Sequence, residues 1–343
     1  MNKQTAPTID DVAREANVST ATVSRCLNSP EQVVKGTRDR VMAVVQRMGY
    51  SPNFGARALA VKRTNTIGAI IPTMENAIFA RGIQAFQEEL REQGVTLLVA
   101  SSSYRSDLEA EQIRTLTARG ADGLLLIGHD RDPEIYRFLE RQNVPVLVVW
   151  AYDEAAPVPS IGFDNQRAMY DLAEAALELG HRRVALISAP VAENDRARSR
   201  LVGTRQAMQD SGLDPDDLDL IETPYGIEQG GAAFSQLMAR AQRPTLVMCG
   251  NDVLATGALK RAHEMGIAVP DDVSITGFDD IELATLAQPE IATVHVPHRE
   301  MGRQAARALV AMVSGKGPAV STQLKTELKL RGSLGPPKLP ALG

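Results

Sequence analysis

The spacing of apolar residues near the N-terminus predicts two short helices joined by a tight turn. Val12, Ala13 and Ala16 recur at helical spacing and form the apolar side of the first helix. Thr8 precedes them as a helix cap, and Asp11 three residues later completes a capping-box pattern. The turn is expected at residues 17–18. A helix–turn–helix unit is therefore predicted over residues 8–28.

The second helix of this unit presents a small, polar and basic outer face. Ser19 is expected to cap it, and Val23 and Leu27 point inward at helical spacing. Hydroxyls, methyl groups and one guanidinium fit the DNA major groove, where they contact base edges and phosphates. The outward positions are Thr20, Ala21, Thr22, Ser24 and Arg25.

A third amphipathic helix follows, which makes a small domain plausible. Thr37 is its expected cap, Val41 and Val44 begin its apolar side, and Gly49 ends it. Val45 and Met48 continue the same side. The alternative is a helical hairpin that belongs to a larger core. Three helices within about fifty residues favour an independent head.

After residue 63 the pattern changes to strands that alternate with helices. Such alternation predicts parallel sheets with helices on both faces, and continuous apolar runs predict buried strands. Ligands of such open sheets bind beyond the carboxyl ends of the strands. The predicted strands are 67–71, 95–100, 123–127, 144–149, 184–188, 245–249 and 273–276, and the predicted helices include 168–179, 198–211, 254–265 and 299–313.

Charge divides the chain in the same place. Residues 1–63 contain ten Lys and Arg against five Asp and Glu, whereas the remainder contains 27 against 37. A cationic head on an anionic chain favours binding to the phosphate backbone of nucleic acid through the head alone.

Several other classes of protein are disfavoured. The chain has no nucleophile elbow, no phosphate-binding glycine loop and no metal-spaced Cys/His cluster, and its five histidines are scattered, so no enzyme, cofactor or metal is expected. Cys26 and Cys249 are interpreted as small buried residues rather than a disulfide. No signal peptide or membrane span is recognisable, and we expect a cytoplasmic protein associated with the nucleoid.

The chain resembles the lactose-repressor and galactose-repressor family of bacterial transcription regulators. The resemblance begins with TIDDVAREANVSTATVSRCLN and TRDRVMAVVQRMGYSPNFGARALAVKRTNTIGAIIP and continues through LELGHRRVALIS, RSRLVGTRQAM, GNDVLATGALKRAHEMGIAVPDDVSITGFDDIELA and ATVHVPHREMG. It implies an α/β protein with a three-helix helix-turn-helix head and a two-lobed, doubly wound, periplasmic-binding-protein-like effector domain. The implied segments are a DNA-binding domain at 1–52, a hinge at 53–63, and an effector and dimerisation domain at 64–333. Its first lobe comprises about 64–161 and 292–322, its second about 162–291 and 323–333, and residues 334–343 are expected to be a disordered tail.

The resemblance also implies which residues contact a small-molecule effector between the lobes. Arg200, three residues before Gly203, matches an arginine that binds effector oxygens in similar proteins. Asp252 is expected to cap the helix that follows it rather than to bind the effector. The implied effector contacts are Ile78, Phe79, Arg105, Trp150, Phe163, Asp164, Arg200, Tyr225, Asn251 and Asp279.

The class of effector stays open between a neutral sugar and an acid. Trp150 stands where many sugar-responsive members have an aspartate, and an indole cannot accept hydrogen bonds from hydroxyls although it can stack on a ring. The arginines of the run RARSR at 196–200, together with Arg105, suit a sugar acid or another organic acid. Against this, Arg196 and Arg198 are expected to be solvated residues at a helix start.

The segment 53–60 has the composition of a helix too short to be stable alone in water, so we expect it to fold on DNA. By resemblance, Leu59 wedges into the central base step of the minor groove, and Asn53 and Arg57 contact DNA nearby. Thr20, Ala21 and Arg25 match the main base-reading positions, with Ser19, Thr22 and Ser24 nearer the backbone.

Together these features predict a dimeric, ligand-responsive transcription regulator, most simply a repressor, that binds a palindromic operator. Beyond Arg331 the chain lacks leucine heptads, so no tetramerisation coil is expected. The sequence leaves open whether the effector releases or tightens DNA binding. A solute-binding protein whose head has lost its DNA function is the alternative from another class.

Overall fold

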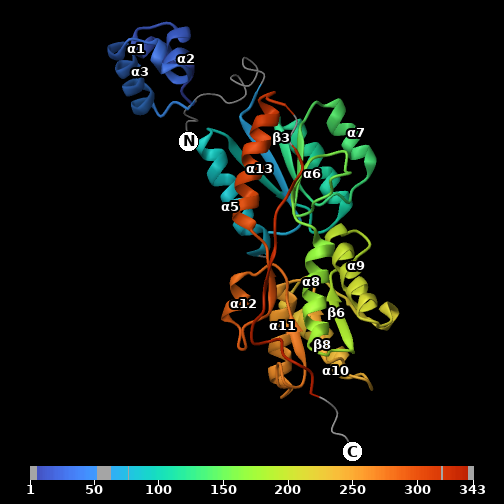
Figure 1. Ribbon diagram of the computed structural model, residues 1–343. Coiled ribbons are helices and arrows are strands. Elements are labelled where there is room, and N and C mark those ends of the chain that lie inside the picture. Colours follow the sequence, from blue (N-terminus) through green and yellow to red (C-terminus); the bar gives the residue numbers. More distant parts are fainter. Residues whose placement is uncertain (1–5, 52–62, 76, 318–319, 339–343) are drawn as a thin grey trace, which may run out of the picture. The chain divides into compact units, whose positions relative to one another are not determined.

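The computed structural model describes residues 6–51, 63–75, 77–317 and 320–338. The chain forms two compact units, the head, Met1–Thr64, and the body, Asn65–Gly343 (Figure 1). Each unit has a hydrophobic core of its own.

The head contains the three predicted helices. They are α1 (Ile9–Ala16), α2 (Thr20–Asn28) and α3 (Lys35–Met48), with a short 3₁₀ turn, η1 (Pro30–Gln32), before α3. The capping box is present, because the amide of Asp11 donates to the Thr8 hydroxyl and the Asp11 carboxylate accepts from the Thr8 amide at 2.9 Å. Ser19 caps α2 by accepting from the amide of Thr22. The predicted helix–turn–helix unit is therefore confirmed.

The beginning of α3 was predicted wrongly. This helix begins at Lys35 and has no side-chain cap, because the amides of Thr37 and Arg38 donate to the carbonyl of Val34. Thr37 lies inside the first turn. Gly49 ends the helix as expected, with a φ of 64°.

The head's core joins all three helices. Val12, Val23 and Val41 are fully buried, and Cys26 lies among them as a small apolar side chain. Because these residues form the inner sides of α1, α2 and α3, the opposite side of α2 is left facing solvent.

The body consists of two α/β lobes (Figure 1). In the first lobe a six-stranded sheet has the order β11-β5-β4-β3-β1-β2, and all its pairings are parallel. Its helices lie on both faces of the sheet. The strands are β1 (Thr66–Ile71), β2 (Thr96–Ser101), β3 (Gly123–Ile127), β4 (Val146–Val149), β5 (Ser160–Gly162) and β11 (Thr322–Gln323), and the helices are α5 (Ala77–Glu92), α6 (Ser106–Ala118), α7 (Pro133–Arg141) and α13 (His298–Val313).

The second lobe has a parallel four-stranded sheet of order β7-β6-β8-β9. A separate antiparallel pair, β10 (Thr293–His295) with β12 (Glu327–Lys329), lies in the segments that join the lobes. The other elements are β6 (Val184–Ser188), β7 (Asp219–Glu222), β8 (Leu246–Cys249), β9 (Ser274–Thr276), α8 (Asn165–Glu178), α9 (Asp195–Asp210), η2 (Pro215–Asp217), α10 (Ile227–Met238), α11 (Asp252–Glu264) and α12 (Glu282–Leu286).

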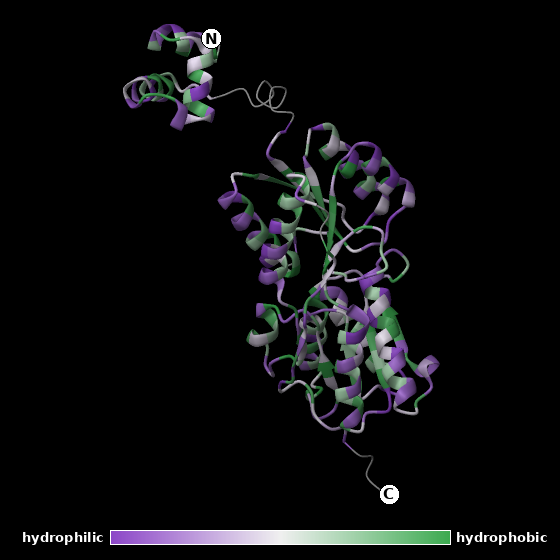
Figure 2. Cartoon of the chain, turned by 45° about the horizontal axis from the view of Figure 1, so that its top comes forward, coloured by the Kyte–Doolittle hydropathy of each residue, from purple (hydrophilic) through white to green (hydrophobic). Residues whose placement is uncertain are grey.

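The predicted strands and helices are present, with one difference in burial. β2 was predicted as a buried strand, but it lies at the edge of its sheet and leaves Leu98 and Val99 more than one third exposed. Apolar composition cannot distinguish an edge strand from a central one. In contrast, β1 and β3 in the middle of the sheet are buried throughout, and apolar residues gather along these strands in Figure 2.

Glycines allow helices of the body to approach closely. Where α5 and α13 pack together, a Cβ built at Gly302 would overlap the backbone carbonyl of Gly82. A Cβ at Gly203 of α9 would likewise overlap the carbonyl of Gln166 in α8. Backbone therefore packs against backbone in both helix pairs.

The end of the described chain is bound to the second lobe, which corrects the expectation of a disordered tail for residues 334–338. Ser333 is fully buried, and its hydroxyl donates to the carbonyl of Ile275. His181 contacts the carbonyl of Gly335 at 2.9 Å, and Lys338 forms an ion pair with Asp272. These contacts with β9 and the residues around it hold the segment in place. Its Gly- and Pro-rich composition gives no sign of such binding. The remainder of the predicted tail lies outside the described residues.

Candidate effector cavity and DNA-reading face

Seven of the ten implied effector contacts meet in one small cavity, which we call the inner cavity. It lies beyond the carboxyl ends of strands from both lobes and has a volume of about 20 Å³. Ile78 and Phe79 come from α5 of the first lobe, whereas Arg200 comes from α9 of the second. Its full lining is Ile78, Phe79, Tyr104, Trp150, Asn194, Arg196, Arg200, Tyr225, Asn251 and Asp279.

Arg200 is the centre of the polar network in this cavity. Its guanidinium donates to the amide oxygen of Asn165 and to the hydroxyl of Tyr225, both at 2.8 Å, and lies 4.8 Å from the ring centre of Phe278. The side chain is buried, and its Nε has no partner among the described residues. One donor of a fixed, buried cation is therefore free for a ligand.

Asp279 provides the acidic side of the cavity. It is buried and has a φ of 101°, a left-handed conformation that is uncommon for a residue with a side chain. Burial raises the pKa of Asp279 to about 6, against the opposing charges of Arg200 and Arg196. The backbone carbonyl of Asp279 accepts a hydrogen bond from Nε2 of His298 at 3.2 Å, and burial lowers the pKa of this imidazole to about 4.

Several buried donors around the cavity lack partners within the described part of the chain. Besides Arg200 Nε, they are the indole Nε1 of Trp150 and the amide Nδ2 of Asn251. Nδ1 of His298, an acceptor when Nε2 carries the proton, also lacks a partner there. Buried donors are normally satisfied, so this group indicates a site for a ligand rich in oxygen acceptors.

Trp150 forms an aromatic wall. It makes an edge-on contact with Phe79 at 5.2 Å between ring centres, and the ring of His298 lies 5.9 Å away. A Cβ at Gly82 would overlap the indole, so the close packing of α5 fixes the ring in place. The cavity therefore combines an apolar face with hydrogen-bond donors.

Three implied contacts do not line the inner cavity. Phe163 is buried behind it against Phe278, and Asp164 caps α8 by accepting from the amide of Arg167. Arg105 is exposed and paired with Asp107. In α8 the residue directed at the network is Asn165, one position after the expected Asp164.

The expected helix-capping role of Asp252 at α11 is corrected, because Asn251, which also lines the inner cavity, is the cap. Asn251 caps this helix, because its side-chain oxygen accepts from the amide of Leu254 at 2.9 Å. Asp252 is the first residue of the helix, is fully buried, and accepts from Thr293 and from the amide of Ile281. It joins α11 to the segments that connect the lobes.

Arg196 differs from its expected solvated position. Its guanidinium is buried, binds the carboxylate of Asp195 at 2.8 Å, and donates to the carbonyl of Ile127 in the first lobe at 3.3 Å. Asp195 also accepts from the amide of His129 at 2.6 Å. These bonds hold the start of α9 against the end of β3.

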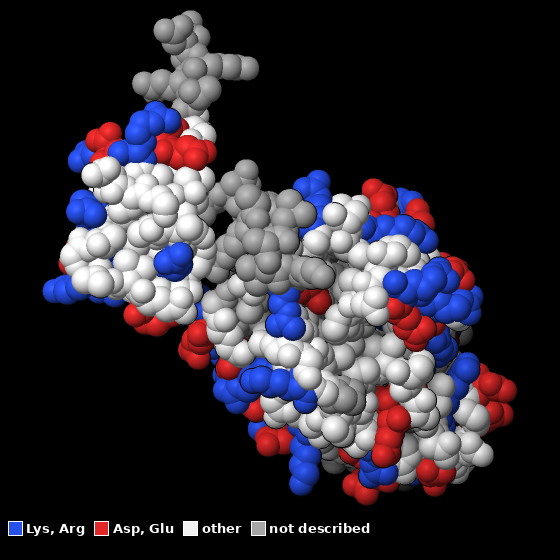
Figure 3. Space-filling model, turned by 90° about the horizontal axis from the view of Figure 1, so that it is seen from above, with Lys and Arg blue, Asp and Glu red and all other residues white. Residues whose placement is uncertain are grey.

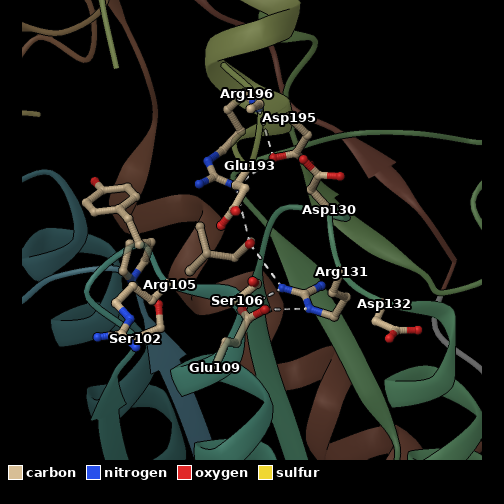
Figure 4. Close-up of a pocket in the computed structure, with 14 residues that line it drawn as sticks. Ser102, Arg105, Ser106, Glu109, Asp130, Arg131, Asp132, Glu193, Asp195 and Arg196 are labelled. Carbon is tan, nitrogen blue, oxygen red and sulfur yellow. Dashed lines mark hydrogen bonds and ion pairs between the residues drawn. The ribbon is translucent and has the colours of Figure 1, made fainter. Parts of the chain in front are cut away.

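Arg198 is exposed, as expected, and pairs with Asp130 across the lobes at 3.1 Å. A second pocket of about 210 Å³ lies beside this contact. Figure 4 shows its lining, with the Arg131–Glu109 pair on one side and Asp195 and Arg196 on the other. Because its donors and acceptors are largely paired with one another, this pocket acts chiefly as the boundary between the lobes.

Sequence reasoning missed Tyr104, Asn165 and His298. Tyr104 follows Ser103 in a turn where both residues have positive φ values. His298 lies at the first position of α13 and reaches the second lobe only through tertiary packing. The polar residues just beyond β2 and β5 were a usable signal for the first two, since ligands bind at strand ends.

Replacing Asp279 by asparagine is expected to change the pH dependence of stability. The folded protein keeps this carboxyl protonated to a higher pH than the unfolded chain does, so stability from this group is present below about pH 4 and lost as pH rises through about 6. Relative to Asp279→Asn, the wild-type free energy of unfolding is expected to fall by about 2 kcal/mol between pH 4 and 7. Urea unfolding of both proteins across this range measures it, and parallel curves would contradict the assignment.

In the head, α2 places the expected DNA-reading residues on its free side. Ala21 and Arg25 are exposed, and Thr20, Thr22 and Ser24 are half-buried. Ser19 is exposed, with its hydroxyl 2.9 Å from that of Thr22. Asn53, Arg57 and Leu59 lie outside the described residues. On the body, basic and acidic side chains are interspersed over the face shown in Figure 3, which favours no single sign of charge there.

The fold and the two sites together define a DNA-binding regulator with a ligand-binding body. The model of bacterial regulatory proteins of the lacI family matches residues 8–53, and that of the periplasmic binding protein-like domain matches residues 173–334. No helix in the described ranges has the length and apolar character needed to cross a membrane.

Characterised relatives extend over nearly the whole chain. The transcriptional repressor CytR of Escherichia coli K12 is 33% identical over 96% of this chain and 97% of its own. Catabolite control protein A of Priestia megaterium is 31% identical over 88% of this chain and 91% of its own. Among solved structures, the lac repressor dimer bound to operator and the anti-inducer ONPF has a TM-score of 0.84 at 25% identity, and covers 96% of this chain and 99% of its own.

The chain therefore belongs to the lacI family of bacterial regulatory proteins. It is a transcriptional repressor of that family, not an enzyme, with a DNA-binding domain and an effector-binding domain.

Proposed function

We propose that this repressor binds a palindromic operator as a homodimer, and that a small effector in the inner cavity controls this binding. The observation that carries the effector site is the group of unpartnered donors on Trp150, Arg200 and Asn251 around Asp279. The lac repressor structure, a dimer bound to operator, supports the dimer and the DNA partner. The protein then acts in the cytoplasm on the nucleoid.

We further propose that the effector is a sugar, a sugar acid or another small organic acid. Arg200 and the free donors suit oxygen acceptors, and the indole of Trp150 suits the apolar face of a ring. A neighbouring structure of 29% identity is titled as the complex of the regulator CelR with cellobiose, which supports a carbohydrate class. Asp279 then accepts a hydroxyl of the ligand.

The DNA contacts are proposed to divide by role. Thr20, Ala21 and Arg25 contact base edges, and Ser19, Thr22 and Ser24 contact the backbone. Asn53, Arg57 and Leu59 of the hinge bind the minor groove, where Leu59 enters the central base step. The effector then acts by changing how the lobes meet, and so the spacing of the two heads.

Selection from a random duplex library by the full chain tests the DNA function. A two-fold symmetric sequence is expected to be enriched, and a protein lacking residues 1–63 is expected to enrich none. Failure of the full chain to enrich a symmetric sequence would favour the solute-binding alternative.

Arg25→Ala tests base reading at the selected operator. We expect a loss of about 1 to 3 kcal/mol in binding, with relaxed preference at one base pair in each half-site. Titration of operators changed at single positions measures it. Arg14→Ala, at an exposed position of α1, is the matched control for lost charge. A uniform loss on every sequence would instead make Arg25 a phosphate contact.

A further inference from the structure

Next to the inner cavity lies a larger space, which we call the outer chamber. It measures about 570 Å³ and is formed by both lobes. The two spaces share Tyr104, Asn194 and Tyr225, so they are neighbours separated by side chains. The rest of the outer lining is Thr73, Glu75, Ser103, Ala189, Pro190, Ala192, Glu193 and Pro224.

Tyr104 lies at the boundary between the two spaces. It lines the inner cavity, the outer chamber and the pocket beside Arg196. Its ring is tilted against that of Tyr225 at 5.6 Å, and the Tyr225 hydroxyl binds Arg200. The boundary ring is thus connected to the central guanidinium through one residue.

The backbone holds Tyr104 in this place at a cost. Ser103 and Tyr104 have φ values of 53° and 58°, in the left-handed region that residues with side chains seldom adopt. Two such residues in succession indicate a local conformation maintained for function rather than for stability.

The two spaces differ in chemistry. The inner cavity has three unpartnered donors, on Arg200, Trp150 and Asn251, and one carboxylate, that of Asp279, each on a side chain more than nine-tenths buried. The outer chamber has the exposed carboxylates of Glu75 and Glu193, neither with a side-chain partner in the described structure, beside the hydroxyls of Thr73 and Ser103. Donors therefore outnumber acceptors at the inner end of a ligand, and acceptors predominate at the outer end.

The volumes of the inner cavity and the outer chamber determine how a ligand can occupy the two spaces. The inner cavity as it stands admits about one water molecule, so a sugar must displace one of the three shared side chains to reach Arg200. Asn194 caps α9 and Tyr225 binds Arg200, which leaves the ring of Tyr104 as the one to move. Once that ring moves, the ligand also extends into the outer chamber, which is large enough for a second ring.

We infer that Tyr104 gates a two-chamber effector site that takes a two-ring sugar acid, with its carboxylate in the inner cavity and its hydroxyl-rich ring in the outer chamber. This inference rests on the proposed effector function of the inner cavity. Guanidinium and amide donors bind the carboxylate, and Glu75 and Glu193 accept from the outer hydroxyls.

Collisional quenching of Trp150, the single tryptophan of the chain, tests the gate without any effector or DNA. Tyr104→Asn removes the ring while suiting the left-handed backbone, and Tyr104→Phe keeps the ring as the matched control. With acrylamide, wild type and Tyr104→Phe are expected to be quenched weakly, and Tyr104→Asn at least threefold more strongly. Cooperative thermal melting of all three shows that they are folded. Equal quenching constants in the three proteins would overturn the gate.

The route through the outer chamber is tested with charged quenchers. Adding Glu75→Gln and Glu193→Gln to Tyr104→Asn is expected to raise quenching by iodide about twofold and to lower quenching by caesium, with acrylamide unchanged, because repulsion of the anion is removed. Both carboxylates are exposed, so folding is not at risk. Unchanged iodide and caesium constants would place the route elsewhere.

The ligand class is tested by the melting temperature with D-gluconate and with cellobionate, which adds one glucosyl ring. In wild type we expect cellobionate to raise the melting temperature more than gluconate does. In the double variant Glu75→Gln with Glu193→Gln, the apparent affinity for cellobionate is expected to fall at least tenfold. A shift of equal size with gluconate, or no shift with either, would overturn the two-ring acid class. Selection of an operator from the duplex library uses neither the quenchers nor the sugar acids. Failure of that selection would therefore count against the proposed function and not against the gate.

Discussion

Arg200→Ala is expected to weaken effector binding at least 100-fold. The substitution removes two buried charge-assisted hydrogen bonds, to Asn165 and Tyr225, together with the unpartnered Nε of this cavity-lining residue. A hydrogen bond to a charged group contributes about 1.5 to 3 kcal/mol. Losing one such bond to the ligand, together with the side-chain positions that Arg200 fixes, therefore accounts for a 100-fold loss of affinity. Calorimetric titration with an effector found by a thermal-shift screen of sugars, sugar acids, carboxylates and nucleobases measures the change.

Arg198→Ala is the matched control for this prediction. It removes an arginine two positions away on α9, but one that is exposed and paired with Asp130 at the edge of the lobes. We expect less than a threefold change in affinity. Equal losses in the two variants would show that the effector does not bind in the inner cavity.

Gly302→Val is expected to destabilise the body by about 3 kcal/mol or more. Its side chain would overlap the carbonyl of Gly82, and because both partners are backbone, α5 and α13 must move apart. Urea unfolding followed by circular dichroism measures the loss. Trp150, which packs on Gly82, is expected to become more exposed at the same time.

Gly36→Ala is the control for glycine replacement in a helix. A Cβ at Gly36, in the first turn of α3, meets nothing within 4 Å, so alanine is expected to be neutral or stabilising by up to about 1 kcal/mol. An equally mild effect of Gly302→Val would mean that α5 and α13 are not held at the distance seen here.

Local patterns predicted the head almost completely. Its caps and apolar spacings, such as Thr8 with Asp11 and the stripe of Val12 and Ala16, lie within one or two helical turns. The error at Thr37 arose because the backbone alone caps α3, through the carbonyl of Val34. A side-chain rule cannot detect such a start.

The body's strands were predictable for the same reason, but contacts between distant segments were not. β5 and β11 are three and two residues long and exist only through pairing with β4 and with each other. α10 includes Gly230 and Gly231, which weaken its helical pattern yet permit its packing on α11. Tertiary packing here overrides local preference.

The candidate site shows the same limit. Resemblance indicated Arg200, Trp150 and Asp279, because they follow recognisable motifs. Tyr104 reaches the site through a left-handed turn, and His298 reaches it through the packing of α13. The spacing of residues along the sequence predicts neither feature. In α8 the Asp164 carboxylate caps the helix, and the amide oxygen of Asn165, one position later, accepts from Arg200.

The contacts between the lobes suggest how a ligand signal would leave the cavity. Asp195 and Arg196 hold the start of α9 against Ile127 and His129 of the first lobe, and Arg196 also lines the inner cavity. A ligand that binds Arg196 therefore competes with, or reinforces, these interlobe bonds. Either outcome shifts the equilibrium between two arrangements of the lobes.

The most direct test of the account is the affinity for the selected operator, measured by fluorescence anisotropy with and without effector in wild type and Arg200→Ala. We expect the effector to change the wild-type dissociation constant at least tenfold, in either direction, and to leave that of Arg200→Ala unchanged. An equal change in both proteins, or none in a wild type shown to bind the effector, would contradict control of the operator through the inner cavity.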